Sequence, residues 1–354
     1  MKRNVLVDFS ELGTICGFGE IARNYAPRLA NNHLDDIHWV FLLPEAFVGT
    51  FGDHISYIRR GREREDLHRL GIHIDLWHAT HQQFRYRGGD SNTIQLLTVH
   101  DLNFLREKKG VHRLRHIVQL DWRIRKSNYL TCISEYVKQD IQDHYNLRGK
   151  SIKVIYNGID CQEEGTRRQP SFISDNTEPF FFTIGQIREK KNFQTLIPMM
   201  KYLPNHKLYI CGDNHFSFAR DLQQLILEEG EDRVFLTGKI SDEEKRWLYC
   251  HADAFLFPSR LEGFGIPVLE AMRFRCKVFS SRFSSLPEVC GNHATYWEDY
   301  EPSTMAAVVR KGVEVWEKEG IQATKALEYS LSFNYETYTE AYIQLYRQLL
   351  AEGK

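Results

Sequence analysis

Two glutamates, Glu262 and Glu270, lie in a segment whose residue types suit the handling of an anionic ligand. Glu262 is in a glycine-rich turn after an apolar run, and Glu270 is one turn into a predicted helix. Gly263 and Gly265 leave backbone N–H groups open to close approach, and a helix N-terminus favours negative charge. An isolated pair of glutamates would be ordinary surface charge. The strand, the glycines and Pro267 at the helix start instead favour a binding or catalytic loop.

Strands and helices alternate along the whole sequence and must position these loops. Apolar runs predict strands at residues 5–7, 38–43, 96–99, 128–133 and 152–156, and again at 180–184, 207–210, 233–236, 254–257 and 277–279. Helical spacing, with Ser134 and Ser241 as N-caps, predicts helices at 20–29, 134–144, from 192, from 241, from 267 and at 335–350. This alternation predicts an α/β fold with two parallel sheets flanked by helices, and ligands of such sheets bind at the carboxyl ends of the strands.

A polar stretch without apolar periodicity separates the two sets of strands. We therefore predict an N-terminal Rossmann-like domain at residues 1–160, a linker at 161–178 and a C-terminal Rossmann-like domain at 179–334. Residues 335–354 should form a packed terminal helix, because its aromatic and leucine residues recur at helical spacing.

Composition limits the classes of partner and the compartment. Forty-six Lys and Arg residues against 47 Asp and Glu residues leave a net charge of −1, so no global field favours nucleic acid. Residues 59–126 are locally basic, which fits an anionic ligand, an anionic membrane surface or simply a solvated helical face. The seven cysteines are scattered, the N-terminus has no signal-peptide core, and no run reaches the roughly 18 apolar residues of a membrane span. We expect a cytoplasmic protein whose membrane contact, if any, is peripheral.

Three other chemistries are disfavoured by the residue pattern. Gly17 and Gly19 lack the third glycine of a dinucleotide fingerprint, and no acidic residue ends the second strand. His78 and His81 have the spacing of metal ligands, but no further ligands are recognisable nearby, so the rim of an acceptor pocket is the preferred interpretation. The sequence has no Asp-x-Asp pair that would bridge a metal to a diphosphate. We therefore expect no bound metal.

Several short motifs, in order, resemble those of the retaining nucleotide-sugar glycosyltransferases of family 4, which have the GT-B fold and carry an E-x7-E motif. The matching motifs are Cys16-Gly17-Phe18-Gly19, Thr98-Val99-His100-Asp101, Asn157-Gly158-Ile159-Asp160, residues 185–192, the pair Glu262 and Glu270, and Leu286-Pro287-Glu288-Val289. The resemblance covers nearly the whole chain. It implies two Rossmann-like domains facing across a cleft, the first for the acceptor and the second for the nucleotide sugar, with the C-terminal helix crossing back to the first domain.

The resemblance also implies roles for single residues. Glu270 would hydrogen-bond the ribose hydroxyls of the nucleotide. Glu262 would contact the donor sugar and stabilise the positive charge that develops at its anomeric carbon. Lys191 would neutralise the diphosphate leaving group, and a preorganised cation at such a site is usually a large catalytic term. A dissociative reaction of this kind needs no pair of carboxylates at the spacing of a retaining hydrolase.

The match departs from the family at two places. Cys16 stands where the family usually has the first glycine of its loop, and Gln186 stands where many members have an arginine. Arg188 or Lys190 would then supply the second diphosphate cation, while His100 would contact the donor sugar as a catalytic residue. The remaining residues expected to bind the donor are Gly17, Gly19, Gly263, Phe264 and Gly265.

The expected activity is retaining transfer of a hexose to a glycan or lipid-linked glycan in surface polysaccharide biosynthesis. The segment 258–272 is similar to that of mannosyltransferases, so GDP-mannose is the favoured donor, and no cofactor is expected beyond that substrate. Two alternatives stay open: a non-catalytic nucleotide-sugar-binding protein, and a GT-B enzyme with epimerase-like or phosphorylase-like chemistry.

Overall fold

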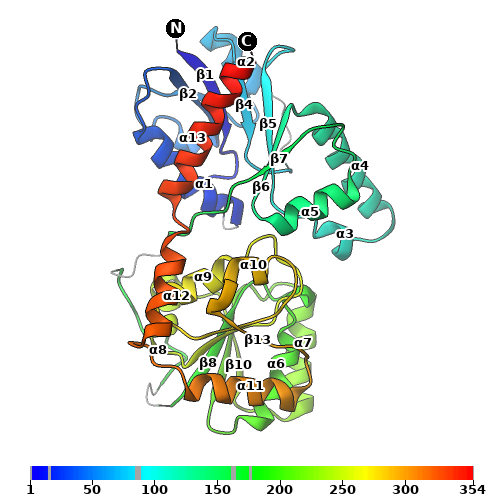
Figure 1. Cartoon of the computed structure of the whole chain (residues 1–354), viewed down its shortest axis with the longest axis vertical. Coiled ribbons are helices and arrows are strands. Elements are labelled where there is room, and N and C mark those ends of the chain that lie inside the picture. The colour runs from blue at the N-terminus through cyan, green and yellow to red at the C-terminus, as the bar shows by residue number, and fades with distance from the viewer. Residues whose placement is uncertain (1, 15–16, 84–88, 161–164, 175–177, 354) are drawn as a thin grey trace. The chain divides into compact units, whose positions relative to one another are not determined.

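The computed structural model describes residues 2–14, 17–83, 89–160, 165–174 and 178–353, and the chain divides into two compact units (Figure 1). Unit 1 consists of residues 1–160 and 333–354, and unit 2 consists of residues 161–332. Cys16 of the first glycine motif and residues 161–164 and 175–177 of the expected linker lie outside the described residues. Each unit holds one parallel sheet with helices, so the α/β fold class expected from the sequence is confirmed.

Unit 1 contains a seven-stranded parallel sheet with the order β3-β2-β1-β4-β5-β6-β7. Its strands are β1 (Arg3–Asp8), β2 (Ile37–Leu43), β3 (Ser56–Arg59), β4 (Leu76–Ala79), β5 (Ile94–Val99), β6 (Tyr129–Cys132) and β7 (Ile152–Val154). Its helices are α1 (Gly17–Asn31), the 3-10 turn η1 (Glu45–Phe47), α2 (Glu63–Leu70), α3 (Phe104–Glu107), α4 (Gly110–Lys126), α5 (Glu135–His144) and α13 (Tyr335–Glu352). The side chain of Ser134 caps α5 by accepting a hydrogen bond from the Val137 N–H, as the sequence predicts.

Unit 2 contains a six-stranded parallel sheet with the order β10-β9-β8-β11-β12-β13. Its strands are β8 (Phe180–Ile184), β9 (Lys207–Cys211), β10 (Val234–Gly238), β11 (Ala254–Phe257), β12 (Val278–Ser280) and β13 (Thr295–Tyr296). Its helices are α6 (Leu196–Met199), α7 (Ser217–Glu229), α8 (Asp242–His251), α9 (Ile266–Arg273), α10 (Leu286–Cys290), α11 (Pro302–Glu314) and α12 (Ile321–Leu331), with 3-10 turns η2 (Glu189–Lys191), η3 (Phe193–Thr195), η4 (Met200–Tyr202) and η5 (Gly291–His293).

Two sequence predictions about elements were wrong. The continuous helix expected from Asn192 is a series of short 3-10 and α-helical turns, because Asn192 has a left-handed backbone (φ 59°) and Pro198 follows shortly after. The strands β3, β4 and β13 were missed. In β4 all four residues are buried, so the strand shows no alternation of polar and apolar residues.

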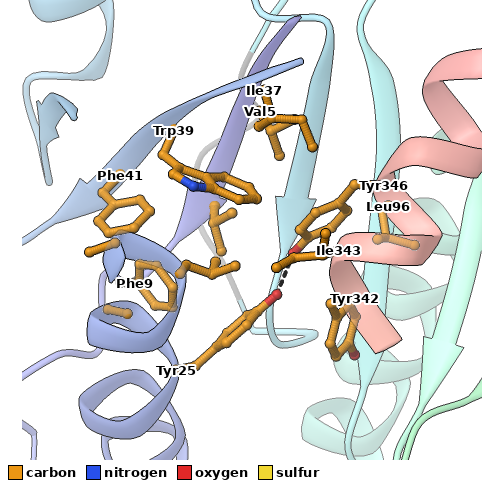
Figure 2. Close-up of a cluster of buried hydrophobic side chains, with 14 of the residues drawn as sticks. Val5, Phe9, Tyr25, Ile37, Trp39, Phe41, Leu96, Tyr342, Ile343 and Tyr346 are labelled. Atoms are coloured by element: carbon orange, nitrogen blue, oxygen red, sulfur yellow. Dashed lines mark hydrogen bonds between the residues drawn. The ribbon is translucent and has the colours of Figure 1, made fainter. Parts of the chain in front are cut away.

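The C-terminal helix α13 packs on unit 1 through a stripe of tyrosines. Figure 2 shows Tyr342 and Tyr346 of α13 against Tyr25 of α1 and the strand residue Trp39, within the core cluster of this unit. Tyr25 and Tyr346 are fully buried. Chain segments that are more than 300 residues apart therefore share one hydrophobic core.

A chain of hydrogen bonds runs through this core. The hydroxyl of Tyr346 lies 2.8 Å from the hydroxyl of Tyr25, drawn as the dashed line in Figure 2, and 2.6 Å from Nδ1 of His78. Nε2 of His78 lies 2.7 Å from the Thr98 hydroxyl, which in turn lies 3.0 Å from the hydroxyl of Tyr342. Burying these groups is tolerable because each has a hydrogen-bond partner. The network thus fixes α13 on the sheet by directed bonds as well as by apolar contact.

Among the described residues, no helix has both the length and the apolar character needed to cross a bilayer.

The tyrosine network predicts a stability difference between two conservative substitutions. Tyr346→Phe removes a hydroxyl that both Tyr25 and His78 use, and it leaves two buried polar atoms without that partner. We expect it to lower the free energy of unfolding by about 1–3 kcal/mol. Tyr202→Phe, at a half-exposed position in η4, should change it by less than about 0.5 kcal/mol. Urea unfolding of both variants measures this, and equal effects would contradict the role assigned to the network.

Candidate functional site

The carboxyl edge of the unit 2 sheet is built from glycines. The strands β8, β9 and β10 lie side by side and lead into Gly185, Gly212 and Gly238 respectively. A side chain on Gly212 would collide with the carbonyl group of Gly185. The backbone therefore folds closely at this edge, where ligands of parallel sheets bind.

Lys191 and Glu262 form an ion pair beside this edge. Nζ of Lys191 lies 2.6 Å from Oε1 of Glu262, and the two side chains are only 12% and 14% exposed. The ammonium group also lies 5.0 Å from the ring centroid of Phe257, the last residue of β11. A Cβ on Gly185 would be 3.1 Å from Cε of Lys191, so the glycine makes room for the lysine. The structure thus brings together two residues that are 71 positions apart in the sequence.

Backbone hydrogen bonds hold the loops that carry this pair. The carbonyl of Lys190 accepts hydrogen bonds from the Arg260 N–H at 2.8 Å and from the Ser259 hydroxyl at 3.3 Å. The N–H of Glu262 donates to the Ser284 hydroxyl at 3.0 Å. Fixed loops of this kind preorganise the two charges, because their positions do not depend on long flexible side chains alone.

The serines after β12 were missed by the sequence analysis. The Ser285 hydroxyl donates to the carbonyl of Phe264 at 2.8 Å and is 3.2 Å from the carbonyl of Glu262. The run of serines between β12 and α10 was the available signal, since short hydroxyl side chains commonly bond to nearby backbone.

The glycine turn between β11 and α9 places the expected donor-binding residues. Gly265 precedes α9 with φ 111°, a left-handed conformation that favours glycine, and a Cβ there would approach Leu286 to 2.8 Å. Phe264 is 3% exposed, so its backbone, and not its ring, is what it can offer to a ligand. Together with Gly263 this turn presents main-chain groups at the start of a helix.

Glu270 is buried and held by two side chains from α8. Its Oε1 lies 2.7 Å from Nζ of Lys245, and its Oε2 accepts a hydrogen bond from the Tyr249 hydroxyl at 3.0 Å. Glu270 was predicted from the sequence, whereas Lys245 and Tyr249 were not. These two are four positions apart on the helix that Ser241 begins with a capping box, which is the spacing of one helix face.

Arg188 and Lys190 are both candidates for the second cation that would face the diphosphate. The Arg188 guanidinium stacks over the ring of Phe216, 4.1 Å from its centroid. Lys190 belongs to the turn η2 together with Lys191, and its backbone is tied to the loop after β11.

A separate group of predicted residues lies in unit 1 at the end of β5. Nε2 of His100 lies 2.7 Å from the carbonyl oxygen of Thr80 and must donate to it, so Nδ1 of the neutral ring is an acceptor. The His100 N–H donates to Oε1 of Gln82 at 3.0 Å. Burial lowers the pKa of His100 to about 4, so the ring is neutral near pH 7. The residue can accept a hydrogen bond from a ligand hydroxyl.

The first turn of α1 contacts this histidine. The ring of Phe18 meets His100 edge-on with centroids 4.9 Å apart and stacks on His81 at 4.8 Å. A side chain on Gly19 would collide with the carbonyl of Thr14, whereas the space beside Gly17 is open. Only Gly19 is therefore required by close packing.

The interpretation of His78 as part of an acceptor-pocket rim was wrong. His78 is fully buried in β4, and both of its ring nitrogens have partners within the tyrosine network. His81 is also mostly buried, and its Nδ1 accepts a hydrogen bond from the Gln83 N–H.

Sequence comparison with known proteins places two family models on this chain. The model described as Glycosyltransferase Family 4 matches residues 20–163, and the model described as Glycosyl transferases group 1 matches residues 166–326. The O-antigen chain mannosyltransferase RfbU of Salmonella typhimurium is 28% identical over 219 residues, which cover 60% of each chain. O-antigen chain mannosyltransferase B of Escherichia coli is 28% identical over 269 residues, which cover 71% of this chain and 70% of that protein. The matched regions therefore span 60% and 70% of the length of these two relatives.

Solved structures share the fold over nearly the whole chain. Sucrose-phosphate synthase from Thermosynechococcus elongatus superposes with a TM-score of 0.74 at 16% identity, covering 99% of this chain and all of that one. Anabaena HepE in complex with UDP and glucose superposes with a TM-score of 0.72 at 18% identity, covering 98% of this chain and all of that one. At such identities the likeness concerns the fold alone.

The burial of Glu270 predicts that its lysine partner matters for stability. Lys245→Met leaves a buried carboxylate without its cation, and we expect a loss of about 2–4 kcal/mol in the free energy of unfolding. Lys201→Met is a matched control, because Lys201 also lies 2.6 Å from a glutamate, Glu229, but at a more exposed site. The control should lose clearly less stability, because solvent screens an exposed ion pair. Chemical denaturation compares them, and a second substitution, Glu270→Gln, should restore part of the loss in Lys245→Met.

Three buried histidines of unit 1 predict a pH dependence of stability. Burial lowers the pKa of His78 to about 3 and the pKa values of His81 and His100 to about 4, below the value of about 6.5 in an unfolded chain. From about pH 6.5 downwards the unfolded chain therefore binds more protons, and the free energy of unfolding should fall by up to about 1.4 kcal/mol per pH unit for each histidine. Urea titrations between pH 7 and pH 5 measure the slope. His100→Asn should reduce this slope by about the contribution of one histidine. A free energy of unfolding that does not change between pH 7 and pH 5 would contradict the lowered pKa values of the three histidines.

Proposed function

The chain belongs to the family of group 1 glycosyl transferases, and on that premise we propose that it transfers a hexose from a nucleoside-diphosphate sugar to a glycan or lipid-linked glycan acceptor. The observation that carries the proposal is the largely buried pair of Lys191 and Glu262 at the carboxyl edge of the unit 2 sheet. A lysine and a carboxylate held together there offer one group to a departing diphosphate and another to a cationic sugar carbon.

The two charges have complementary tasks in the proposed reaction. The bond between the anomeric carbon and the diphosphate oxygen breaks, and Lys191 compensates the negative charge that collects on the diphosphate. The Glu262 carboxylate stabilises the positive charge on the sugar. The acceptor hydroxyl forms the new bond to the anomeric carbon and gives its proton to the departing phosphate oxygen. We propose retention of configuration, with the acceptor attacking from the face that the leaving group has left.

We further propose that cationic side chains and main-chain N–H groups, and not a metal ion, balance the diphosphate charge. Lys191 and either Arg188 or Lys190 supply the cations, and the turn before α9 supplies the N–H donors. Glu270, aimed by Lys245 and Tyr249, would accept hydrogen bonds from the ribose. In unit 1, neutral His100 would accept a hydrogen bond from a donor-sugar hydroxyl through Nδ1.

GDP-mannose is the favoured donor, because both O-antigen relatives are described as mannosyltransferases. The acceptor would be a growing surface polysaccharide, in line with the same descriptions. If its glycan is carried on a lipid, the protein would work in the cytoplasm at an anionic membrane surface. A UDP-linked donor is the competing choice, since Anabaena HepE binds UDP and glucose.

Nucleotide selectivity tests the donor class. The purified protein is heated with GDP, UDP, ADP or dTDP, and with their common sugar conjugates, in the absence and presence of Mg²⁺. A nucleotide at 100 times its dissociation constant should add about 2.7 kcal/mol to the free energy of unfolding, which gives a clear rise in melting temperature. We expect GDP and GDP-mannose to give the largest shift with or without the metal. A shift only with Mg²⁺ would contradict metal independence, and no shift with any of them would contradict the proposed function.

Glu262→Gln separates catalysis from binding. The substitution keeps the shape but removes the charge, so we expect nucleotide binding to change less than about threefold while sugar transfer falls by about 100-fold or more. Glu229→Gln, at a half-exposed ion pair far from the glycine edge in sequence, is the control and should transfer normally. Transfer is followed by release of the nucleoside diphosphate and by NMR of the product's anomeric centre. Undiminished transfer in Glu262→Gln would rule out the assigned role, and an inactive wild type that binds nucleotide would favour the non-catalytic alternative.

A further inference from the structure

The helix α4 of unit 1 carries a stripe of large apolar side chains that is exposed to solvent. Val111, Leu114, Val118 and Trp122 are 80%, 59%, 58% and 47% exposed, respectively. Their spacing of three and four residues places them on one side of the helix. The buried residues of α4, Leu120 and Ile124, lie on the opposite side, against the unit. The apolar stripe therefore faces away from the core it would normally join.

Basic side chains surround this stripe. The exposed ones on α4 and immediately before it are Lys108, Lys109, Arg113, Arg115, Arg125 and Lys126. The only acidic residue in α4 is Asp121, whose Oδ2 lies 2.6 Å from Nε of Arg125. The first turn has no acidic residue and its N-cap makes no side-chain bond, although acidic residues are the ones that stabilise a helix start. Basic residues therefore precede and begin the helix at its N-terminal end, where acidic residues would stabilise the helix itself.

Outside α4, some described cations of the basic segment 59–126 are bound within the fold and do not face solvent freely. Arg59 is bound to the buried carboxylate of Asp66, and Arg106 makes two hydrogen bonds to Asp140. These arginines serve the fold, so local charge in the sequence is a poor guide to the partner. The coincidence of exposed apolar and basic side chains occurs on α4.

We propose that α4 docks unit 1 onto a bilayer containing anionic phospholipid, with the helix lying in the plane of the interface. A helix of this length is about 25 Å long and can lay its whole apolar stripe at the level of the acyl chains. The flanking arginines and lysines then meet the phosphate groups. The positive charge of α4 favours a negatively charged partner. Pairing with a second copy of α4 would bring two basic helices together and cause repulsion, whereas anionic headgroups would neutralise the charge of a single helix.

This inference deepens the proposed function, since docking would bring the enzyme to a lipid-linked acceptor. It identifies the surface that makes the contact and is independent of which sugar is transferred. Binding to vesicles needs neither donor nor acceptor, so the two proposals can fail separately.

The test uses the full chain and flotation with vesicles of phosphatidylcholine alone or mixed with phosphatidylglycerol. We expect binding to the mixed vesicles at low salt and a marked loss at high salt, because the charge contribution is screened. Lipids brominated in their acyl chains should quench the fluorescence of Trp122, and this quenching should disappear in Trp122→Phe. Absence of wild-type binding to mixed vesicles would overturn the proposal.

Two sets of variants assign the binding to the stripe. Leu114→Ser with Val118→Ser removes apolar surface that is already exposed, so the fold should persist and vesicle affinity should fall at least about tenfold. Leu227→Ser with Val315→Ser makes the same change at exposed positions of unit 2 and should leave affinity unchanged. Circular dichroism checks the fold of each variant.

Two further outcomes are decisive. Equal affinity of the stripe variant and the control would overturn the proposal, as would concentration-dependent self-association of the wild type that the stripe variant abolishes.

The nucleotide-induced thermal shift, measured without vesicles, should be the same in the stripe variant and the wild type. Loss of that shift in every protein would count against the proposed function and not against the docking surface.

Discussion

Parallel pairing of every strand constrains both units of this protein. A parallel strand can be followed by its neighbour only after a crossover, and the crossover helices cover the sheet, so the strands become buried on both faces. Polar groups that must reach a ligand are then confined to the loops at the strand ends. In unit 2 the carboxyl edge ends in closely packed glycines, and Lys191 and Glu262 lie beside it. In unit 1 the same kind of edge carries His100.

Burial makes partners obligatory for the charges at these edges. Glu270 is almost fully buried, and Lys245 and Tyr249 offset the cost of desolvating its carboxylate. Lys191 and Glu262 compensate each other in the same way. Each charge in such a pair needs the other in order to be buried. The same two charges are also held in fixed positions, so a diphosphate or a cationic sugar can interact with them without any rearrangement of the protein.

The tyrosine network of unit 1 consists of neutral groups and not of paired charges. His78, Tyr25 and Tyr346 are neutral and fully buried, and the Tyr346 hydroxyl bonds to both of the others. These bonds connect α13 to α1 and to β4. These hydrogen bonds are directional, so they fix the rotation of α13 about its axis. Apolar contacts alone would allow the helix to slide. The stripe on α4 differs from this network, because its apolar side chains are exposed to solvent. The proposed bilayer contact would cover them.

Local sequence determined the features that depend on neighbouring residues alone. Strand and helix alternation gave the fold class, and Ser241 predicted its capping box. These succeed because caps, turns and periodicity are set within a few residues. Only the tertiary structure decided that Lys245 holds Glu270 and that His78 is a core residue, because such contacts arise from the packing of elements distant in sequence. Spacing can nominate a residue for chemistry, but burial and partners decide what it can do.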